Sequence, residues 1–117
     1  MRQQLLTKEI RDKLPPLYAQ DSLGMEAIAY LKLFHAYGGG SWYATEFDGD
    51  DTFFGYVCGL TPGGDEFGYF SLKELESLDA RVGGKIVPGL QAIERDMHFT
   101  PTRLCDIAEV VGDEGER

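Results

Sequence analysis

Three aspartates directly after an apolar run carry the first candidate chemistry in this sequence. In WYATEFDGDDTFFGY, residues 42–56, the side chains of Asp48, Asp50 and Thr52 form the pattern Asp-x-Asp-x-Thr. This pattern is typical of phosphatases of the haloacid-dehalogenase type, in which one aspartate attacks phosphorus and carboxylates hold magnesium. That enzyme class needs a parallel sheet, whereas the aromatic segment after the aspartates predicts an immediate antiparallel return of the chain. The sequence therefore argues against a phosphatase.

A calcium-binding loop fits these residues no better. With Asp48 at position 1 of such a loop, the glycine required at position 6 is Phe53 and the glutamate required at position 12 is Gly59. The next acidic turn, at 61–65, is expected at the other end of a strand and so about 25 Å away, too far to share an ion. We interpret residues 48–51 as a solvated turn and predict neither a metal site nor a cofactor.

Glu46 is the one carboxylate with a route to acid–base chemistry. It falls in phase with Trp42 and Ala44 in an alternating segment, where burial would raise its pKa into the range of a general acid. A lone glutamate on a strand more often pairs with a neighbouring strand. A small hydrolase or nucleotide-processing enzyme that uses Glu46 and the turn at 48–51 is therefore our alternative hypothesis.

The other reactive side chains lack the neighbours that catalysis requires. His35 and His98 have no histidine, cysteine or carboxylate three or four residues further along the chain, as a zinc site on a helix would have. Ser41 is not part of a G-x-S-x-G elbow, and Lys85 lacks the spacing and the hydroxyl residue of a phosphate-binding loop. We predict no catalytic residue, although the sequence does not decide whether the protein is an enzyme.

Length and composition indicate one folded domain. The chain has 117 residues, of which 43% are hydrophobic and 12% aromatic, enough to build a core without disulfides. We predict a single domain over residues 1–112 and a disordered acidic tail at 113–117. Cys58 and Cys105 show no partner spacing, and no apolar run is long enough to cross a bilayer. We therefore expect a cytoplasmic protein with reduced thiols and no membrane partner.

The negative charge is concentrated in the middle of the chain. The net charge is −9, and residues 48–79 hold eight acidic side chains but one basic side chain. Such a surface repels phosphate groups, because nucleic-acid affinity comes largely from lysine and arginine. We expect no direct binding of nucleic acid, and instead a partner protein with a basic surface.

The elements that would position these residues predict an α+β fold. Alternating or aromatic-rich segments predict strands at 25–37, 41–47, 52–60 and 66–71, and a weaker one at 90–99. N-cap residues predict three helices, near 7–14 after Thr7, near 71–80 after Ser71, and near 101–111 after Thr100. The expected architecture is an antiparallel meander sheet of four or five strands with about three short helices packed on it.

The meander contains more aromatic residues than one buried face needs. They fall on both phases of the alternation, at Trp42, Tyr43, Phe47, Phe53, Phe54, Tyr56, Phe67, Tyr69 and Phe70. Either the helices cover both faces, or one face is open and forms a protein-binding surface rimmed by acidic turns. The candidate binding residues are Trp42, Tyr43, Glu46, Asp48, Asp50, Asp51, Asp65 and Glu66. A homo-oligomer in which an edge strand pairs with a second copy is a further alternative.

With these segments the chain resembles DUF2958, a bacterial family of unknown function. The matching phrases are LPPLYAQ, WYATEFD, FFGYVCGL, EFGYFSLKELESL and IERDMHFTP, which extend over nearly the whole chain up to about Asp106. The resemblance implies a small cytoplasmic bacterial protein, often encoded with plasmid, phage or other mobile-element genes, and implies no reaction or cofactor. Our leading hypothesis is a non-catalytic interaction or accessory factor of a mobile genetic element that binds a basic, nucleic-acid-handling protein.

Overall fold

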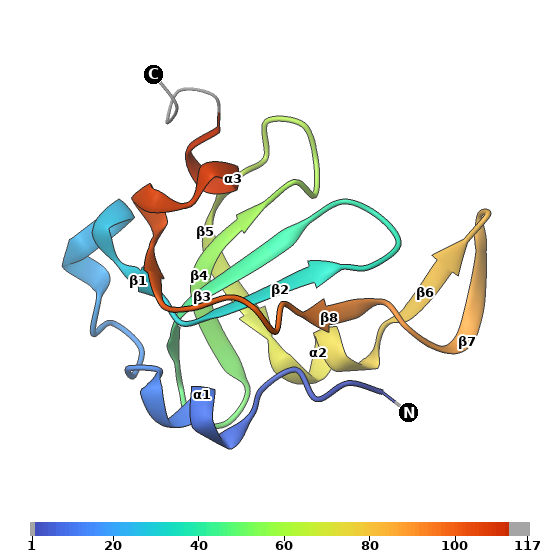
Figure 1. Cartoon of the computed structure of the whole chain (residues 1–117), viewed down its shortest axis with the longest axis horizontal. Helices are drawn as coiled ribbons and strands as arrows, with labels where there is room; N and C mark the ends of the chain where they lie inside the picture. Colours follow the sequence, from blue (N-terminus) through green and yellow to red (C-terminus); the bar gives the residue numbers. More distant parts are fainter. Residues whose placement is uncertain (1, 113–117) are drawn as a thin grey trace.

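Five antiparallel strands form the central sheet of the protein, in the order β5-β4-β3-β2-β8 (Figure 1). These strands are β2 (Leu31–His35), β3 (Ser41–Phe47), β4 (Thr52–Cys58), β5 (Glu66–Ser71) and β8 (Ile93–Arg95). The computed structural model describes residues 2–112, so the tail predicted at 113–117 lies outside the described residues. The predicted α+β fold with an antiparallel sheet is confirmed. Within residues 2–112 no helix is long and apolar enough to span a membrane.

The strand predicted at 25–37 is present but divided. It consists of β1 (Ile28–Ala29) and β2, with Ala29, Leu31 and Leu33 buried and the intervening side chains half-buried. β1 leaves the central sheet and pairs with β9 (Thr102–Arg103) in a small second sheet. The alternation of the sequence therefore predicted the side-chain directions correctly, but not the break between the two sheets.

Both faces of the central sheet are covered along β3. All of its residues from Ser41 to Phe47 are buried. Trp42 and Phe53 belong to a core on one face, whereas Tyr43, together with Cys58, belongs to a second core on the other face. Of the two alternatives left open by the aromatic pattern, burial of both faces therefore holds for this part of the sheet.

Two of the three predicted helices begin at the expected N-caps. These are α1 (Lys8–Lys13), where Thr7 Oγ1 accepts a hydrogen bond from Ile10 N at 3.2 Å, and α2 (Leu72–Ser77), where Ser71 Oγ accepts one from Glu74 N at 3.1 Å. A 3-10 helix, η1 (Asp21–Glu26), precedes β1. Local capping chemistry was therefore sufficient to predict both α-helices.

The C-terminal helix predicted at 101–111 is present only in its last part. Thr102 and Arg103 form β9, which is followed by the 3-10 helix η2 (Leu104–Asp106) and by α3 (Ala108–Val111). Thr102 Oγ1 donates to the carbonyl oxygen of Thr100, and the backbone pairs with β1 instead of coiling. Hydrogen bonding to the distant strand β1 thus prevents the helix that the capping pattern at Thr100 predicted.

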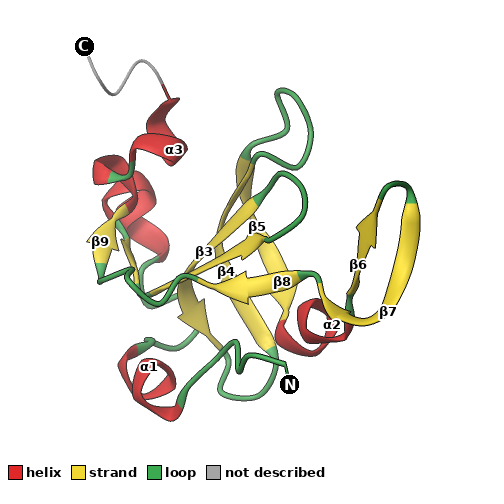
Figure 2. Cartoon of the chain, turned by 45° about the vertical axis from the view of Figure 1, so that its right-hand side comes forward, coloured by secondary structure: helices red, strands yellow, loops and turns green. Residues whose placement is uncertain are grey.

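A projecting β-hairpin was missed by the sequence analysis. It consists of β6 (Asp79–Val82) and β7 (Lys85–Gln91), and we call residues 79–91 the arm. Gly83 and Gly84 form its turn, with φ angles of 60° and 81° that suit the tight turns of hairpins. Figures 1 and 2 show the arm standing away from the central sheet in both views.

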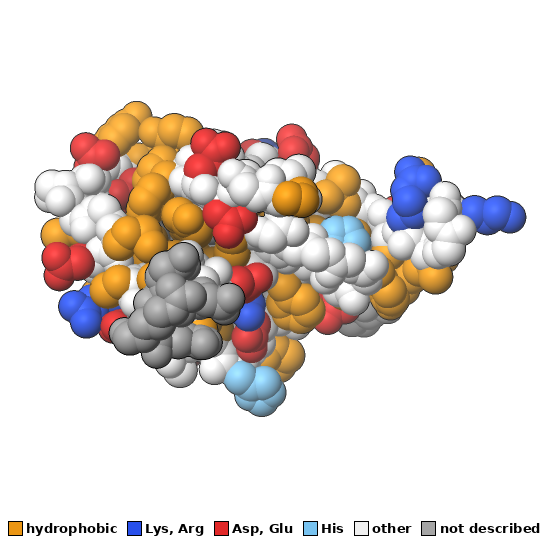
Figure 3. All heavy atoms as spheres, turned by 90° about the horizontal axis from the view of Figure 1, so that it is seen from above, with side chains coloured by type: hydrophobic (Ala, Val, Ile, Leu, Met, Phe, Trp, Pro, Cys, Tyr) orange, Lys and Arg blue, Asp and Glu red, His pale blue; other side chains and the backbone are white. Residues whose placement is uncertain are grey.

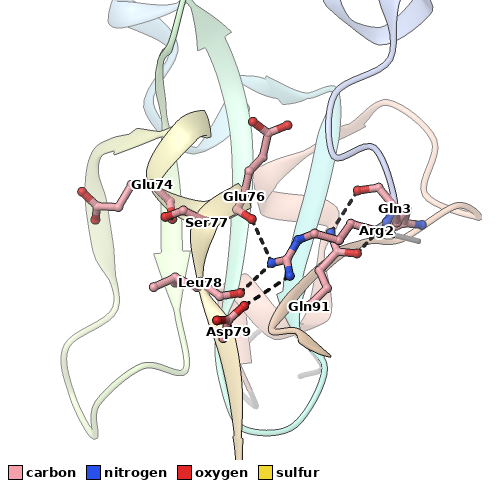
Figure 4. A network of polar contacts seen from close by, with 8 residues as sticks. All are labelled: Arg2, Gln3, Glu74, Glu76, Ser77, Leu78, Asp79 and Gln91. Atoms are coloured by element: carbon pink, nitrogen blue, oxygen red, sulfur yellow. Dashed lines mark hydrogen bonds and ion pairs between the residues drawn. The ribbon is translucent and has the colours of Figure 1, made fainter. Parts of the chain in front are cut away.

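The N-terminal segment clamps the base of the arm (Figure 4). Arg2 Nη2 donates to the carbonyl oxygens of Glu76 and Leu78 at 2.9 and 2.8 Å. Gln3 N donates to Gln91 Oε1 at 2.6 Å, and Gln91 Nε2 donates back to the Gln3 carbonyl oxygen at 2.9 Å. The arm therefore leaves the body in a fixed direction.

The two edges of the central sheet differ in their protection. At β8, Gln3 Oε1 accepts from Arg95 N at 2.6 Å and Gln3 Nε2 donates to the Arg95 carbonyl oxygen at 3.2 Å, so a side-chain amide occupies the place of a neighbouring strand. At the opposite edge, β5 pairs with β4 and with no other strand of the described chain. The outer edge of β5 is therefore open to a further strand.

The glycine pair at the middle of β4 and β5 provides a test of this packing. Gly55 and Gly68 lie directly opposite each other, but a Cβ on Gly55 would lie 1.8 Å from the Tyr43 carbonyl oxygen, whereas one on Gly68 would meet no atom within 4 Å. We expect Gly55→Ala to lower the free energy of unfolding by at least about 3 kcal/mol, because backbone atoms must move. Gly68→Ala is the matched control and should stay within about 1 kcal/mol of the native protein in urea denaturation. Equal stability of the two variants would contradict the close approach of β3 and β4.

Candidate protein-binding surface

Glu46 is buried, and both of its carboxylate oxygens are already engaged. Its exposed fraction is 2%. Oε1 accepts a hydrogen bond from Tyr18 N and Oε2 accepts one from Gln20 N, each at 2.8 Å. The carboxylate thus binds two backbone N–H groups, those of Tyr18 and Gln20, in the loop before η1. This arrangement favours a positioning role for Glu46 over proton exchange with a substrate.

The loop that Glu46 holds contains a strained residue. Tyr18 has a φ angle of 74°, in the left-handed region, and it is the only residue other than glycine with a positive φ in the described chain. The adjacent Gln20 side chain fixes the loop further, since its Nε2 donates to the carbonyl oxygens of Ile28 and Thr45 at 2.9 and 2.8 Å. Strain of this kind persists where the surroundings enforce it, and it is concentrated at functional sites. Here it presents the Tyr18 side chain, which is 68% exposed.

Tyr18 lies beside a ladder of aromatic side chains on β4 and β5. Phe54 is paired with Tyr69, and Tyr56 with Phe67, at ring-centroid distances of 5.0 and 5.1 Å. Phe54 also stacks on Phe67 at 5.9 Å. We call Tyr18, Phe54, Tyr56, Phe67 and Tyr69 the aromatic patch. Its outer members are accessible, because Tyr69 is 57% exposed.

The aromatic patch has an acidic rim. A hydrogen bond with the Tyr18 hydroxyl, followed by partial burial, raises the pKa of Tyr69, and the charge of Asp21 adds to the effect. Burial, followed by the charge of Asp65, raises the pKa of Tyr56. Glu66 is exposed at the first position of β5. Figure 3 shows hydrophobic side chains gathered between acidic ones over the body of the molecule.

Two aspartates of the turn at 48–51 stabilise the fold. Asp48 Oδ1 accepts hydrogen bonds from the backbone N–H groups of Asp50, Asp51 and Thr52 at 2.8, 2.8 and 3.0 Å, which lower its pKa. Asp51 accepts from Ser71 Oγ at 2.6 Å and from Lys73 N at 2.7 Å. The hydrogen bond from Ser71 is the main cause of a lowered pKa of Asp51.

The acidic turns on either side of β4 do not share a metal site. The turn at 48–51 and the loop at 59–65 lie at opposite ends of β4, as the meander predicted. Asp65 Oδ1 accepts from Gly59 N at 3.0 Å and so closes its own loop. Among residues 2–112, no group of three or more histidine, cysteine or carboxylate side chains is placed to hold a metal ion.

Trp42 and Tyr43, both candidate binding residues, lie in the core. Their exposed fractions are 8% and 1%, so neither side chain is accessible to a partner in this structure. The sequence pattern placed aromatic residues on both faces of the sheet, but it did not show which of them the termini would cover. Tyr18, which lies outside the strands, was missed altogether. The only feature of the sequence that could have indicated it is the turn after two prolines.

Tyr43 belongs to a polar cluster that fastens α3 to the sheet. The Tyr43 hydroxyl donates to Glu109 Oε1 at 2.5 Å, and Ser41 Oγ donates to Glu109 Oε2 at 3.0 Å. Burial is the largest cause of a raised pKa of Tyr43. Burial, followed by the charge of Glu109, raises the pKa of Cys58 to about 12. A thiol and a phenol with raised pKa values remain protonated near neutral pH, so this cluster contains no activated nucleophile.

A hollow of about 400 Å³ lies at the open edge of β5. Val57 and Leu60 provide its apolar walls, and Glu66 contributes a negative charge. Two further hollows, of about 310 and 420 Å³, lie on either side of Asp96 and Met97. The β-strand residues of the first hollow, Val57, Glu66 and Gly68, lie on the opposite face of the sheet from the aromatic patch, so the hollow adjoins the patch across the edge of β5.

Glu46→Gln tests whether this carboxylate positions the loop. The side-chain amide keeps the volume but turns a donor toward one of the two N–H groups, so we expect a loss of about 1–3 kcal/mol in the free energy of unfolding. Glu66→Gln is the control, because Glu66 is exposed, and urea denaturation should show no loss. A Glu46→Gln protein of native stability would contradict the positioning role.

The aspartates of the turn predict a specific pH dependence. Asp48 and Asp51 have pKa values lowered below the ordinary 3.8. Their stabilisation is therefore fully present above that pH and is lost as the pH falls through it toward the lower folded-state values. Urea midpoints at pH 6 and at about pH 3 should differ less for Asp48→Asn and Asp51→Asn than for the native protein. Asp50→Asn should behave like the native protein, and an unchanged pH dependence in all three variants would refute the assignment.

Comparison with known proteins places this surface within a family. The family model described as "Protein of unknown function (DUF2958)" matches residues 5–116. No curated protein and no solved structure matches the chain. Three of the phrases that carry the resemblance contain members of the aromatic patch: Tyr18 in LPPLYAQ, Phe54 and Tyr56 in FFGYVCGL, and Phe67 and Tyr69 in EFGYFSLKELESL. The chain belongs to the DUF2958 family.

Proposed function

We propose that this protein is a non-catalytic interaction factor that binds a partner protein through the aromatic patch and the open edge of β5. The observation that carries the proposal is the strained backbone of Tyr18, which the buried Glu46 holds beside Tyr69. Backbone strain is concentrated at functional sites, so an exposed tyrosine held in this conformation supports a role in recognition.

The composition of the surface supports recognition of protein. Tyrosine anchors dominate the binding energy of many interfaces, because they bury a large area at little loss of side-chain entropy. An open edge strand adds main-chain hydrogen bonds to an extended segment of a partner. The aromatic patch offers both, with Tyr18 and Tyr69 exposed beside β5.

The charge of the surface defines the class of partner. Asp21 and Asp65 lie near the aromatic patch, Glu66 lies at the open edge of β5, and residues 48–79 carry most of the net charge. A partner segment with lysine or arginine between apolar residues complements this pattern. Proteins that handle nucleic acids carry such segments, and the mobile-element setting implied by the family resemblance supplies such partners in the bacterial cytoplasm.

An enzyme based on Glu46 and the turn at 48–51 is less well supported. Both oxygens of Glu46 bind backbone N–H groups, as do the carboxylates of Asp48 and Asp51. Of this set, Asp50 alone has an exposed carboxylate without a hydrogen-bond partner within the described residues. The alternative therefore lacks a free acid–base pair.

Selection from a displayed peptide library tests the proposal with the full chain as bait. We expect peptides in which lysine or arginine alternates with apolar residues to be enriched. Binding of a selected peptide, measured by fluorescence anisotropy, should weaken about tenfold or more in Tyr69→Ser, because an interface anchor is lost.

Tyr37→Ser is the matched control, because Tyr37 is 49% exposed in the turn after β2 and is not a member of the aromatic patch. Its affinity should equal that of the native protein. Asp48 and Asp51 should be left unchanged, since their loss would weaken the fold itself. Enrichment of no peptide, or equal weakening by both tyrosine substitutions, would contradict the proposed surface.

A further inference from the structure

The arm exposes apolar side chains that nothing in the described chain covers. Every residue from 81 to 89 is exposed, and Val82, Ile86 and Val87 are 47%, 56% and 38% exposed. A two-stranded hairpin of this kind is only marginally stable in water without packing against another element. Its fixed base and bare end therefore indicate an element built to contact another molecule.

The arm has a charge opposite to that of the rest of the molecule. The arm contains Arg81 and Lys85, and its one acidic residue, Asp79, is paired with Arg2 at its base, although the net charge of the chain is −9. In Figure 3 the projecting arm carries basic side chains at its end, while the acidic side chains lie mainly over the body. Arg81 is paired with Ile86, and Val82 with Lys85, so each face of the arm combines a cation with an aliphatic residue.

The open edge of β5 is complementary to the arm in each of these respects. It carries Glu66 and the neighbouring Asp65, and its hollow is walled by Val57 and Leu60. The hollow of about 400 Å³ is large enough for an aliphatic side chain such as that of Ile86. Acidic groups beside apolar walls suit a basic and aliphatic segment, and this match of charge selects the arm as an occupant.

We infer that the arm of one copy docks against the open edge of β5 in a second copy. Arg81 and Lys85 approach Glu66 and Asp65, and an aliphatic residue of the arm enters the hollow between Val57 and Leu60. Since the donating arm and the receiving edge are different surfaces, a two-fold pair contains the contact twice. The inference rests on the proposed function, because both use the open edge of β5. It therefore implies that self-association and partner binding compete.

Two charge-reversal variants, one of the arm and one of the β5 edge, test this contact. The arm-reversed variant carries Arg81→Glu and Lys85→Glu, and the edge-reversed variant carries Thr61→Lys and Glu66→Lys, leaving Asp65 in place to close its loop. All four substituted residues are exposed, and circular dichroism checks that both variants fold. Sedimentation velocity over about 1–100 µM measures association of the native protein, of each variant and of their equimolar mixture.

We expect the native protein to associate, each variant alone to be monomeric, and the mixture to associate again, because each reversed arm then meets a reversed edge. A native protein that stays monomeric over this range would overturn the inference, as would variants that associate normally or a mixture that is not restored. If the monomeric native protein bound a DNA duplex through its arm, the arm would belong to a nucleic-acid interface instead. Peptide binding that Tyr69→Ser abolishes in a monomeric protein would leave the proposed function intact while this inference failed.

Discussion

The buried carboxylate of Glu46 is the interaction on which the functional surface depends. A charged group at 2% exposure is stable only when hydrogen bonds replace its water, and the N–H groups of Tyr18 and Gln20 provide them at 2.8 Å each. The loop before η1 is thereby attached to the middle of the sheet. The same bonds that offset the burial of the charge hold Tyr18 in its left-handed conformation.

The difference in protection between the β8 and β5 edges of the sheet follows from the course of the N-terminal part of the chain. Gln3 shields β8 and helps to clamp the arm, while Glu46 directs the next loop onto the face of β4 and β5 and leaves the β5 edge uncovered. An open edge strand is a liability that proteins usually remove by charge, by shortness or by covering. Here Glu66 charges the edge without covering it, which limits pairing to segments that carry the opposite charge.

The sequence predicted those parts of the fold that depend on local signals. Strand alternation and the caps at Thr7 and Ser71 act within a few residues, and these elements were predicted correctly. The helix predicted from Thr100 was wrong in its first part because β1 offers hydrogen bonds from a distant segment. The arm was missed because the sequence predicted a helix near 71–80 and no strand between its end and the weaker strand at 90–99.

The candidate site was predictable only in its chemistry. The sequence indicated aromatic residues with an acidic rim, but burial of Trp42 and Tyr43 depends on which segments cover the sheet, a long-range property.

Residue-by-residue hydrogen exchange in the native protein tests the central role of Glu46 most directly. The amides of Tyr18 and Gln20 should be protected to the level of the β3 amides; exchange at the rate of an unstructured loop would contradict the account.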